Sequence, residues 1–304
     1  MSKFTFWADL FKFSDGVLDE DYPFDKNYSL KLKGKSDDGL VETSLKFEQS
    51  KPDATMQSKN AVELKQKVVF NSYEVESKVK SGGKMTSEIL VKLASIDDTF
   101  KGWSYILTPT LIVGGTLDKA STITGLKYSQ ENLEAKATID APGLNTVTVE
   151  AAFKPDKGSE LIVGGTADFT VKDTTLKSYE AGLLYKLDDK FSYGIKNWST
   201  DGKDFGNFSI NTLHSVNKAT DVASKVCYSL SEKALDATAG FTHSFNDDWT
   251  WKAKVNSAGQ FATSSKHKIS KSTFVTISSA LDIGSKALSY GNPHPFGIAL
   301  ESKF

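Results

Sequence analysis

The chain has 304 residues, and its 37 basic residues nearly balance 38 acidic ones, which leaves a formal net charge of -1. This balance argues against a nucleic-acid-binding protein, which usually carries an overall positive field. Every basic residue is a lysine, so the chain lacks the planar guanidinium groups that hold a carboxylate or phosphate in two places. Anion recognition must come from mobile point charges, which favours weak and transient contacts.

The usual signals for disulfides, export and membrane helices are missing. Cys227 is the only cysteine, which excludes an intramolecular disulfide and a thiolate zinc site, and we interpret it as a small apolar residue that is buried or faces lipid. No run approaches the roughly 18 apolar residues of a membrane helix. Acids at Asp9 and Asp15 stand where a secretory signal needs an apolar core. A β-barrel would show neither signal, because its strands are short and alternate in polarity.

The first 26 residues predict a short amphipathic helix and a tail. Side chains at helical spacing form one face, namely Trp7, Leu10, Phe11, Ser14, Val17 and Leu18. The charged residues Asp9, Lys12 and Asp15 lie elsewhere on the helical wheel. The pattern alone would allow this helix to pack on any core.

From residue 27 to the end, apolar and polar side chains alternate with a period of two, which indicates β-strands. Residues 28–33 and 41–48 form the first two runs, and the polar segment 35–39 between them predicts a hairpin turn. Nineteen such runs follow one another at about 15 residues each, which matches a membrane strand of about 10 residues plus a short turn. We expect one domain over 1–304, with a helix and tail in 1–26 and a barrel in 27–304.

Alternation alone does not say which side of the sheet is wet, since a soluble sandwich or barrel alternates as well. Nineteen strands are too many for a barrel filled by side chains, because sixteen to eighteen already enclose an aqueous channel. The strand count therefore favours an all-β transmembrane barrel over a soluble β-sheet binding protein, which stays an alternative.

The polar face of the clearest strands carries more lysine than glutamate. Its lysines are Lys31, Lys33, Lys46, Lys78, Lys80, Lys92, Lys136, Lys252, Lys254 and Lys303. Its glutamates are Glu42, Glu48, Glu74, Glu76, Glu134, Glu150 and Glu301. If this face lines a pore, the excess of positive charge would enrich ATP, ADP, phosphate and carboxylates, weakly and in a salt-sensitive way. Any single lysine could also be an ordinary solvated residue.

Nothing in the sequence predicts an enzyme, a metal site or a cofactor. The four histidines, His214, His243, His267 and His294, show no ligand spacing. Gly114-Gly115 and Gly164-Gly165 lack the rest of a phosphate loop, so we interpret them as strand-packing glycines. Trp103, Trp198, Trp249 and Trp251 lie near strand ends and would suit aromatic girdles at a lipid interface.

Both ends of the chain resemble one family. Trp7-Ala8-Asp9-Leu10-Phe11-Lys12, then Val17-Leu18, Tyr22-Pro23-Phe24 and residues 30–40, are similar to the opening of the voltage-dependent anion channels of the mitochondrial outer membrane. Ala253-Lys254-Val255-Asn256, residues 278–282 and residues 296–301 resemble the end of those channels.

The resemblance implies a nineteen-stranded barrel, closed by parallel pairing of the first strand with the last, with the N-terminal helix inside the pore. It implies a voltage-gated, weakly anion-selective diffusion channel for ATP, ADP and phosphate in the mitochondrial outer membrane. The gating helix would include Trp7, Asp9, Leu10, Phe11, Lys12 and Asp15, and Lys12 would also line the pore. Expected partners are membrane lipids, nucleotides and small anions as permeants, and further copies of the chain in a homo-oligomer, with no nucleic acid.

The chain also departs from the family pattern. Acids at Asp15 and Glu20 replace basic residues, and the segment that is a glycine-rich hinge in relatives holds Asp21, Pro23 and Asp25. Ser77 takes the place of a membrane-facing glutamate found in animal members, so we expect the regulation attributed to that glutamate to be absent. A rival family with the same architecture, the pore subunit of the protein-import translocase, usually has a longer extension than the 26 residues that precede the first predicted strand here.

Overall fold

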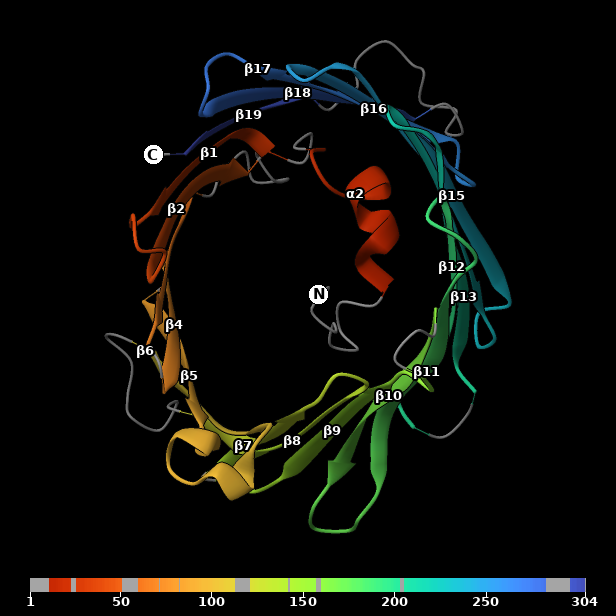
Figure 1. The fold of residues 1–304 in the computed structure, drawn as a ribbon. Helices are drawn as coiled ribbons and strands as arrows, with labels where there is room; N and C mark the ends of the chain where they lie inside the picture. The colour runs from red at the N-terminus through yellow and green to blue at the C-terminus, as the bar shows by residue number, and fades with distance from the viewer. Residues whose placement is uncertain are drawn as a thin grey trace.

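The computed structural model describes residues 11–22, 26–50, 60–70, 72–81, 83–112, 121–141, 143–156, 160–202, 205–282 and 296–303. Within these ranges, nineteen strands form one sheet that closes on itself, and a short helical segment lies inside the ring (Figure 1). No helix of the described ranges is long and apolar enough to cross a membrane. The closed sheet of nineteen strands with a helical segment inside it confirms the fold expected from the sequence.

The helical segments are η1 (Phe11–Ser14), α2 (Asp15–Leu18), η3 (Leu93–Ser95) and η4 (Asp98–Phe100). The first nine strands are β1 (Lys26–Lys35), β2 (Val41–Ser50), β3 (Asn60–Val69), β4 (Tyr73–Lys80), β5 (Lys84–Lys92), β6 (Trp103–Ile112), β7 (Ser121–Ser129), β8 (Leu133–Ala141) and β9 (Thr146–Phe153). The others are β10 (Leu161–Thr170), β11 (Leu176–Lys186), β12 (Phe191–Ser199), β13 (Asn207–Asn217), β14 (Thr220–Ser229), β15 (Ala234–Asn246), β16 (Trp249–Asn256), β17 (Gln260–Lys268), β18 (Thr273–Asp282) and β19 (Phe296–Lys303).

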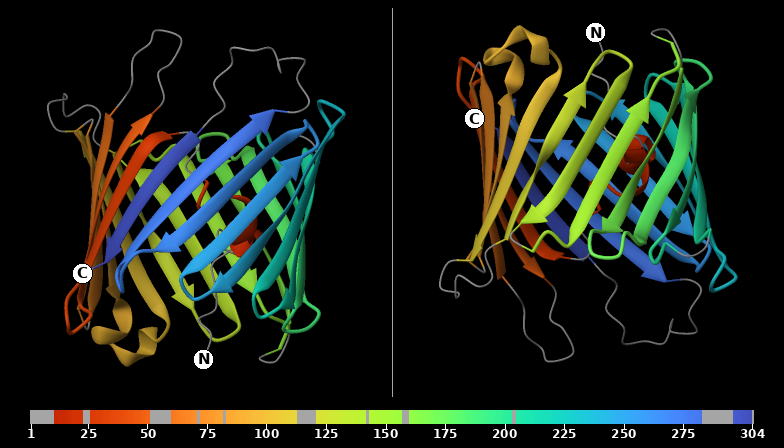
Figure 2. Two further views of the ribbon diagram at one scale, coloured as in Figure 1. Left: turned by 90° about the horizontal axis from the view of Figure 1, so that it is seen from above. Right: turned by 90° about the horizontal axis from the view of Figure 1, so that it is seen from below.

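The ring closes through β1 and β19, which run parallel and pair from Tyr28 with Ile298 to Lys33 with Lys303. Because neighbouring strands alternate in direction, an odd number of strands brings the first and last together in the same direction. The other neighbouring strands pair antiparallel and tilt together around the wall (Figure 2). Among the described strands, closure leaves no exposed edge, as a barrel in hydrocarbon requires.

Paired residues on adjacent strands point to the same side of a sheet, so one contact with the enclosed helix orients the whole wall. Lys252 donates a hydrogen bond to the helix carbonyl of Gly16, which places it on the inward face. Its partner Ser264 pairs in turn with Ser278, and the same parity continues from strand to strand around the ring. The lysine-bearing positions therefore face inward and the apolar positions face outward.

The outward face is apolar and carries an aromatic band near each end of the barrel. One band lies on the side of the barrel where β19 ends and includes Tyr73, Trp103, Tyr128, Tyr185, Phe191, Trp249 and Trp251. The other lies near the opposite ends of the strands and includes Tyr28, Phe208, Tyr228, Phe261 and Phe296. Exposed aliphatic side chains such as Leu64 and Ile210 lie between them. Two aromatic girdles around an apolar band are typical of a transmembrane barrel.

Two sequence interpretations were wrong about the side on which a residue lies. Trp198 faces inward, because it pairs with the inward Glu180 and has the Lys196 ammonium 5.0 Å from its ring centroid. Cys227 also faces inward and is only half-buried, since it pairs with Asp236 on the polar face of β15. In both cases the apolar character of the side chain suggested that it faces lipid or a dry core. The register of the strand instead places it on the inward face.

Gly164 and Gly165 lie within β10, as the strand-packing interpretation predicts. A Cβ atom on Gly165 would come 2.5 Å from the backbone oxygen of Glu180 on β11. A larger residue at Gly165 would therefore push neighbouring strands apart.

Polar side chains on the outward wall are mostly paired with one another. The pairs are Ser77 with Ser87 at 3.1 Å, Thr212 with Ser224 at 2.8 Å, Tyr105 with Thr124 at 2.5 Å, Trp249 with Ser265 at 2.9 Å and Trp251 with Thr263 at 2.7 Å. Gln66 differs: it is exposed on the outward face of β3, between Thr43 and Ser77, and its amide makes no side-chain hydrogen bond within the described residues. An unpaired amide in an apolar medium costs free energy.

We predict that Gln66→Leu stabilises the barrel. Removing the unpaired amide from the outward face should raise the free energy of unfolding by about 1 to 2 kcal/mol. The measurement is urea unfolding from lipid vesicles, followed by tryptophan fluorescence. Thr212→Val is the matched control, since it removes a hydroxyl that has a partner and should not stabilise. An unchanged or lower stability of Gln66→Leu would contradict the prediction.

Candidate functional site

The inward face carries an excess of positive charge. At regularly paired positions with described side chains, this face holds twenty lysines, namely Lys31, Lys33, Lys35, Lys46, Lys65, Lys67, Lys78, Lys80, Lys84, Lys92, Lys127, Lys136, Lys186, Lys196, Lys225, Lys252, Lys254, Lys266, Lys268 and Lys303. Among described side chains, the same positions hold fourteen carboxylates, namely Glu42, Glu48, Glu63, Glu74, Glu76, Glu88, Glu134, Asp140, Glu150, Asp168, Glu180, Asp221, Asp236 and Glu301.

Ion pairs between neighbouring strands hold many of these groups in place. Examples are Lys33 with Glu301 at 2.6 Å, Lys65 with Glu76 at 2.8 Å, Lys67 with Glu74 at 2.6 Å and Lys196 with Glu180 at 3.1 Å. Because lysines outnumber carboxylates, a surplus of ammonium groups is left over. The Lys35 and Lys80 side chains are 60% and 56% exposed, so water reaches the inward face.

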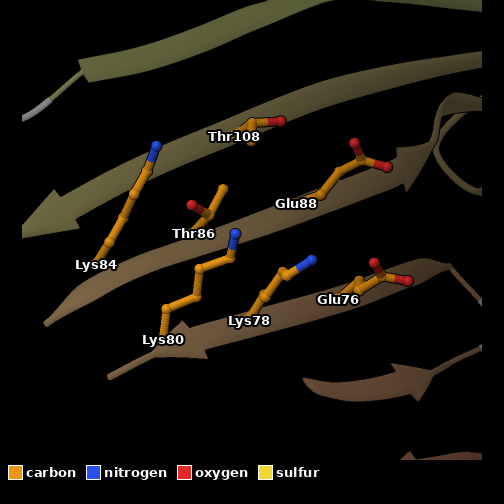
Figure 3. A pocket seen from close by; sticks show the side chains of 7 residues that line it. All are labelled: Glu76, Lys78, Lys80, Lys84, Thr86, Glu88 and Thr108. Carbon is orange, nitrogen blue, oxygen red and sulfur yellow. The ribbon is translucent and has the colours of Figure 1, made fainter. Parts of the chain in front are cut away.

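A hollow of about 240 Å³ lies on the wall formed by β4, β5 and β6 (Figure 3). Its lining is polar and consists of Glu76, Lys78, Lys80, Lys84, Thr86, Glu88 and Thr108. Lys78 and Lys80 share one carboxylate, Glu63, at 3.1 and 4.0 Å. This wall therefore offers ammonium groups to the interior.

The enclosed helix packs on the wall where inward side chains are small or apolar. Phe13 lies against the buried cluster of Ala152, Ile162 and Leu184 on β9 to β11. Val17 and Leu18 pack on Ala223 of β14, with Leu213 of β13 beside them. A Cβ atom on Gly240 would lie 3.2 Å from a methyl carbon of Leu18, so glycine there lets the helix approach closely. The helix lies to one side of the ring (Figure 1).

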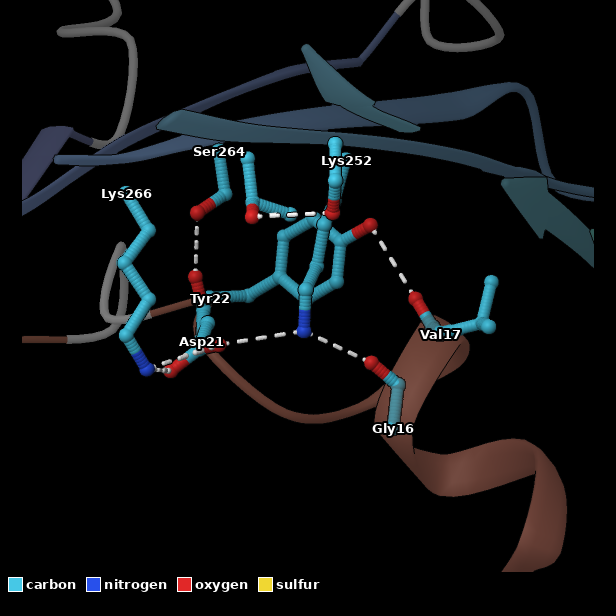
Figure 4. Close-up of polar contacts among 9 residues, drawn as sticks. Gly16, Val17, Asp21, Tyr22, Lys252, Ser264 and Lys266 are labelled. Atoms are coloured by element: carbon cyan, nitrogen blue, oxygen red, sulfur yellow. Dashed lines mark hydrogen bonds and ion pairs between the residues drawn. The ribbon is translucent and has the colours of Figure 1, made fainter. Parts of the chain in front are cut away.

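Lysines of β16 and β17 hold the end of the helix and the segment that follows it (Figure 4). Lys252 is only 8% exposed; it donates to the Gly16 carbonyl at 2.7 Å and pairs with the Asp21 carboxylate at 3.1 Å. Lys266 pairs with the same carboxylate at 3.1 Å, and Lys254 donates to the Leu18 carbonyl. Cations at the last helical carbonyls satisfy acceptors that have no partner within the helix. We call Asp21, Lys252, Lys254 and Lys266 the helix clamp.

Tyr22 completes the attachment. Its hydroxyl donates to the Val17 carbonyl at 3.2 Å, and the Lys254 ammonium lies 4.5 Å from its ring centroid. Ser264 donates to the backbone carbonyl of Asp21. Asp21 has a φ of 62°, in the left-handed region that aspartate tolerates better than most residues. The turn after the helix is therefore fixed by both backbone conformation and side-chain contacts.

The environment of the helix shifts two carboxyl groups in opposite directions. Burial tends to raise the pKa of Asp21, but the ammonium groups of Lys252 and Lys266 more than offset it, and the pKa is lowered. Burial and the nearby Asp19 raise the pKa of Asp15. Ionised Asp21 therefore favours docking of the helix, whereas ionised Asp15 opposes it.

The structure brings only some of the predicted site residues together. The strand lysines chosen from the sequence, Lys31, Lys33, Lys46, Lys78, Lys80, Lys92, Lys136, Lys252 and Lys254, all occupy inward positions. Lys12 is exposed on the helical segment, and Asp15 is half-buried in α2. Phe11 begins η1. Trp7, Asp9 and Leu10 lie outside the described residues.

Sequence reasoning missed the part played by Asp21 and Lys266. Asp21 was noted only as a departure from a glycine-rich hinge, and its partner is far away in the chain. Lys266 lies in β17, where serine and threonine weaken the alternation that identified the other lysines. Among the described residues, no group of three or more His, Cys, Asp or Glu side chains could hold a metal ion.

Comparisons with known proteins agree with this architecture. A family model described as eukaryotic porin matches residues 5–293. Two solved variants of the Rhodopseudomonas blastica porin, with three and five substitutions, each share 10% sequence identity with this chain at a TM-score of 0.50. The alignments cover 81% and 78% of this chain and 93% and 91% of those chains, and at this identity they show the fold alone. No curated protein matches the chain in sequence.

We predict that Asp21→Asn loosens the helix. Lys252 and Lys266 would lose their shared carboxylate, at a cost of about 1 to 3 kcal/mol in docking free energy. The backbone N–H groups of Asp19 and Glu20, which donate to the Asp15 carbonyl, should then exchange with deuterium about tenfold faster or more. Asp19→Asn is the control: its carboxylate is 61% exposed and 3.6 Å from Lys254, so the effect should be small. Equal exchange in both variants would contradict the role of the clamp.

The lowered pKa of Asp21 predicts an acid-sensitive clamp. Its contribution to docking is fully present above the ordinary value of 3.8 and is lost as the pH falls through the lower pKa of the docked state. A spin label at residue 12 should therefore report faster motion as the pH is lowered through this range. In Asp21→Asn the label should already be mobile at neutral pH, and the difference between the two proteins should shrink in acid. A constant difference at all pH values would refute the prediction.

Proposed function

Since this chain belongs to the eukaryotic porin family, whose members are pore-forming channels, we propose that it is a voltage-gated, weakly anion-selective channel and not an enzyme. It passes ATP, ADP, phosphate and other small metabolites across the mitochondrial outer membrane, and residues 1–304 act as one porin domain. Membrane lipids surround it, and copies of the chain associate within the membrane.

One observation carries the proposal: the surplus of lysine on the inward face of a barrel whose outward face is apolar. Fixed positive charges around a confined column of water raise the local concentration of anions. Exposed charges are screened over about 8 Å at physiological ionic strength, so this preference is weak and falls with salt. The absence of arginine keeps each contact brief, as a permeation pathway requires.

The charges of the helical segment support a response to voltage. Lys12 is the one basic residue between positions 11 and 22, against the acids Asp15, Asp19, Glu20 and Asp21. Moving one charge through the full membrane potential changes the free energy by about 2.3 kcal/mol per 100 mV. Docking by the helix clamp opposes such movement. The segment therefore stays docked at low voltage and responds as the field grows.

We predict that reversing two inward charges changes ion selectivity. The double variant Lys78→Glu, Lys80→Glu should shift the reversal potential in planar bilayers from weak anion preference towards cations, most strongly in dilute salt. The control is Lys218→Glu, Lys271→Glu, which makes the same charge change at exposed turn residues and should leave the reversal potential nearly unchanged.

The same recordings test the proposal itself. Failure of the purified chain to form pores would remove channel function, and pores that conduct equally at all voltages would remove only voltage gating. An unchanged reversal potential in the inward variant would refute the role of the lysine surplus. Carbonate-resistant recovery in the outer-membrane fraction of mitochondria tests the location.

A further inference from the structure

The turns at one rim of the barrel are acidic. Because neighbouring strands alternate in direction, every turn that follows an odd-numbered strand lies at the rim where β19 ends, which we call the acidic rim (Figure 2). The sequence contains four Asp-Asp dipeptides, and all of them lie in turns of this rim. They are Asp37-Asp38 after β1, Asp97-Asp98 after β5, Asp188-Asp189 after β11 and Asp247-Asp248 after β15. The four pairs are therefore spread around the mouth (Figure 1).

The two mouths of the barrel differ in charge. Besides the eight aspartates of the pairs, the described turn residues of the acidic rim include three carboxylates, Glu131, Asp156 and Glu160. These eleven carboxylates stand against five lysines, namely Lys101, Lys154, Lys190, Lys218 and Lys271. At the opposite rim, the described turn residues are nearly balanced, with Asp173, Asp201 and Glu232 against Lys172 and Lys233. The negative charge is thus confined to one mouth.

Turn structure explains one aspartate of each pair. In three pairs, one carboxylate accepts hydrogen bonds from backbone N–H groups of its own turn, as aspartate commonly does. These bonds join Asp38 to Leu40 at 3.0 Å, Asp97 to Thr99 at 2.8 Å, and Asp188 to both Lys190 and Phe191 at 2.7 Å. In the fourth pair, Asp248 forms an ion pair with Lys268 at 3.4 Å.

The second aspartate of each pair has no such structural task. Asp37, Asp98, Asp189 and Asp247 are exposed, and within the described part of the chain their side chains make no hydrogen bond or ion pair. An acid placed directly beside another adds repulsion between like charges. What these four residues contribute is negative charge at the mouth. We call them the rim aspartates.

The inward face behind the acidic rim has the opposite sign, since its lysines outnumber its carboxylates. We propose that the rim aspartates give the open channel a direction of easy current, an inference that rests on the proposed function. A pore that is negative at one mouth and positive inside acts as a junction between a cation exchanger and an anion exchanger. With the acidic rim facing the positive chamber, cations enter past the aspartates and anions enter from the opposite mouth. Both collect where the sign changes, so the conductance rises.

The opposite polarity draws both kinds of ion away from that junction, so the conductance falls. This asymmetry needs no movement of the chain, and it is therefore present immediately after a voltage step, before any closure. It depends on how far the rim charges act into the mouth, which is about 30 Å in 0.01 M salt and about 3 Å in 1 M salt. The asymmetry is strong in dilute salt and vanishes in concentrated salt.

The test is the current through single open channels in planar bilayers, recorded at equal voltages of opposite sign. For the unmodified chain, the two currents should differ by about 1.5-fold or more in about 0.01 M potassium chloride and should be equal in about 1 M. The fourfold variant Asp37→Asn, Asp98→Asn, Asp189→Asn, Asp247→Asn should give nearly equal currents in dilute salt as well. Asparagine keeps the size of each side chain, and no described side-chain contact is lost.

The matched control neutralises carboxylates at the opposite rim, in the variant Asp173→Asn, Asp201→Asn, Glu232→Gln. It should keep the asymmetry of the unmodified chain or increase it. Three results overturn the proposal while leaving channel function intact: equal currents for the unmodified chain in dilute salt, full asymmetry in the fourfold variant, or loss of asymmetry in the control. A chain that forms no pores overturns the channel proposal itself.

The sign of the asymmetry is tested on channels of known orientation. Gln130 is exposed in a turn of the acidic rim, so Gln130→Cys in a Cys227→Ser background presents a thiol at that mouth. A maleimide carried on a polymer too large to pass the channel should lower the current only when it is added to the chamber that this rim faces. The larger current should flow when that chamber is positive. A larger current at the other polarity would refute the proposed junction.

If the fourfold variant does not insert into bilayers, the four single variants replace it. Each removes one of the four charges and should bring the ratio of the two currents part of the way towards one. Ratios identical to that of the unmodified chain in all four single variants would overturn the role of the rim aspartates.

Discussion

The structure depends on a single alternation of inward and outward side chains, which the strand interiors keep through all nineteen pairings around the ring. A shift of one residue in any pairing would turn the following inward side chains outward. Because each register keeps the parity of its neighbour, lysines meet carboxylates across strands on one face, and apolar residues form a continuous band on the other. The irregular pairings lie close to strand ends, as between Asp168 and Phe169, where an extra residue does not reverse the face of the strand interior.

The inward wall also binds the enclosed helix, which is not part of the alternating strand pattern. Small residues on β9, β14 and β15 provide room for Phe13 and Leu18, and lysines two residues apart on β16 meet the carbonyls at the end of the helix. Apolar packing and charge thus act at different points along the same segment. A helical segment as short as α2 has little stability of its own, so the wall supplies most of it.

Strand number and half of the inward lysines could be predicted from period-two alternation, because it is a local property, whereas closure by parallel pairing was implied by the family resemblance. Trp198 and Cys227 were placed on the wrong side. The residue type of an aromatic residue or a cysteine near a strand end does not tell which face of the sheet its side chain occupies. Asp21 with Lys252 and Lys266 could not be predicted in the same way. These residues are far apart in the chain, and only the three-dimensional structure brings them together.

The pairing of Tyr28 with Ile298 also affects how the molecule can be made. The strands β2 to β18 lie between the two partners in the sequence, so all of them must be synthesised before the seam of β1 and β19 can form. Until then, two strand edges stay open to water or to other chains, which is a liability for aggregation. Covering these edges between synthesis and insertion therefore favours closure over aggregation.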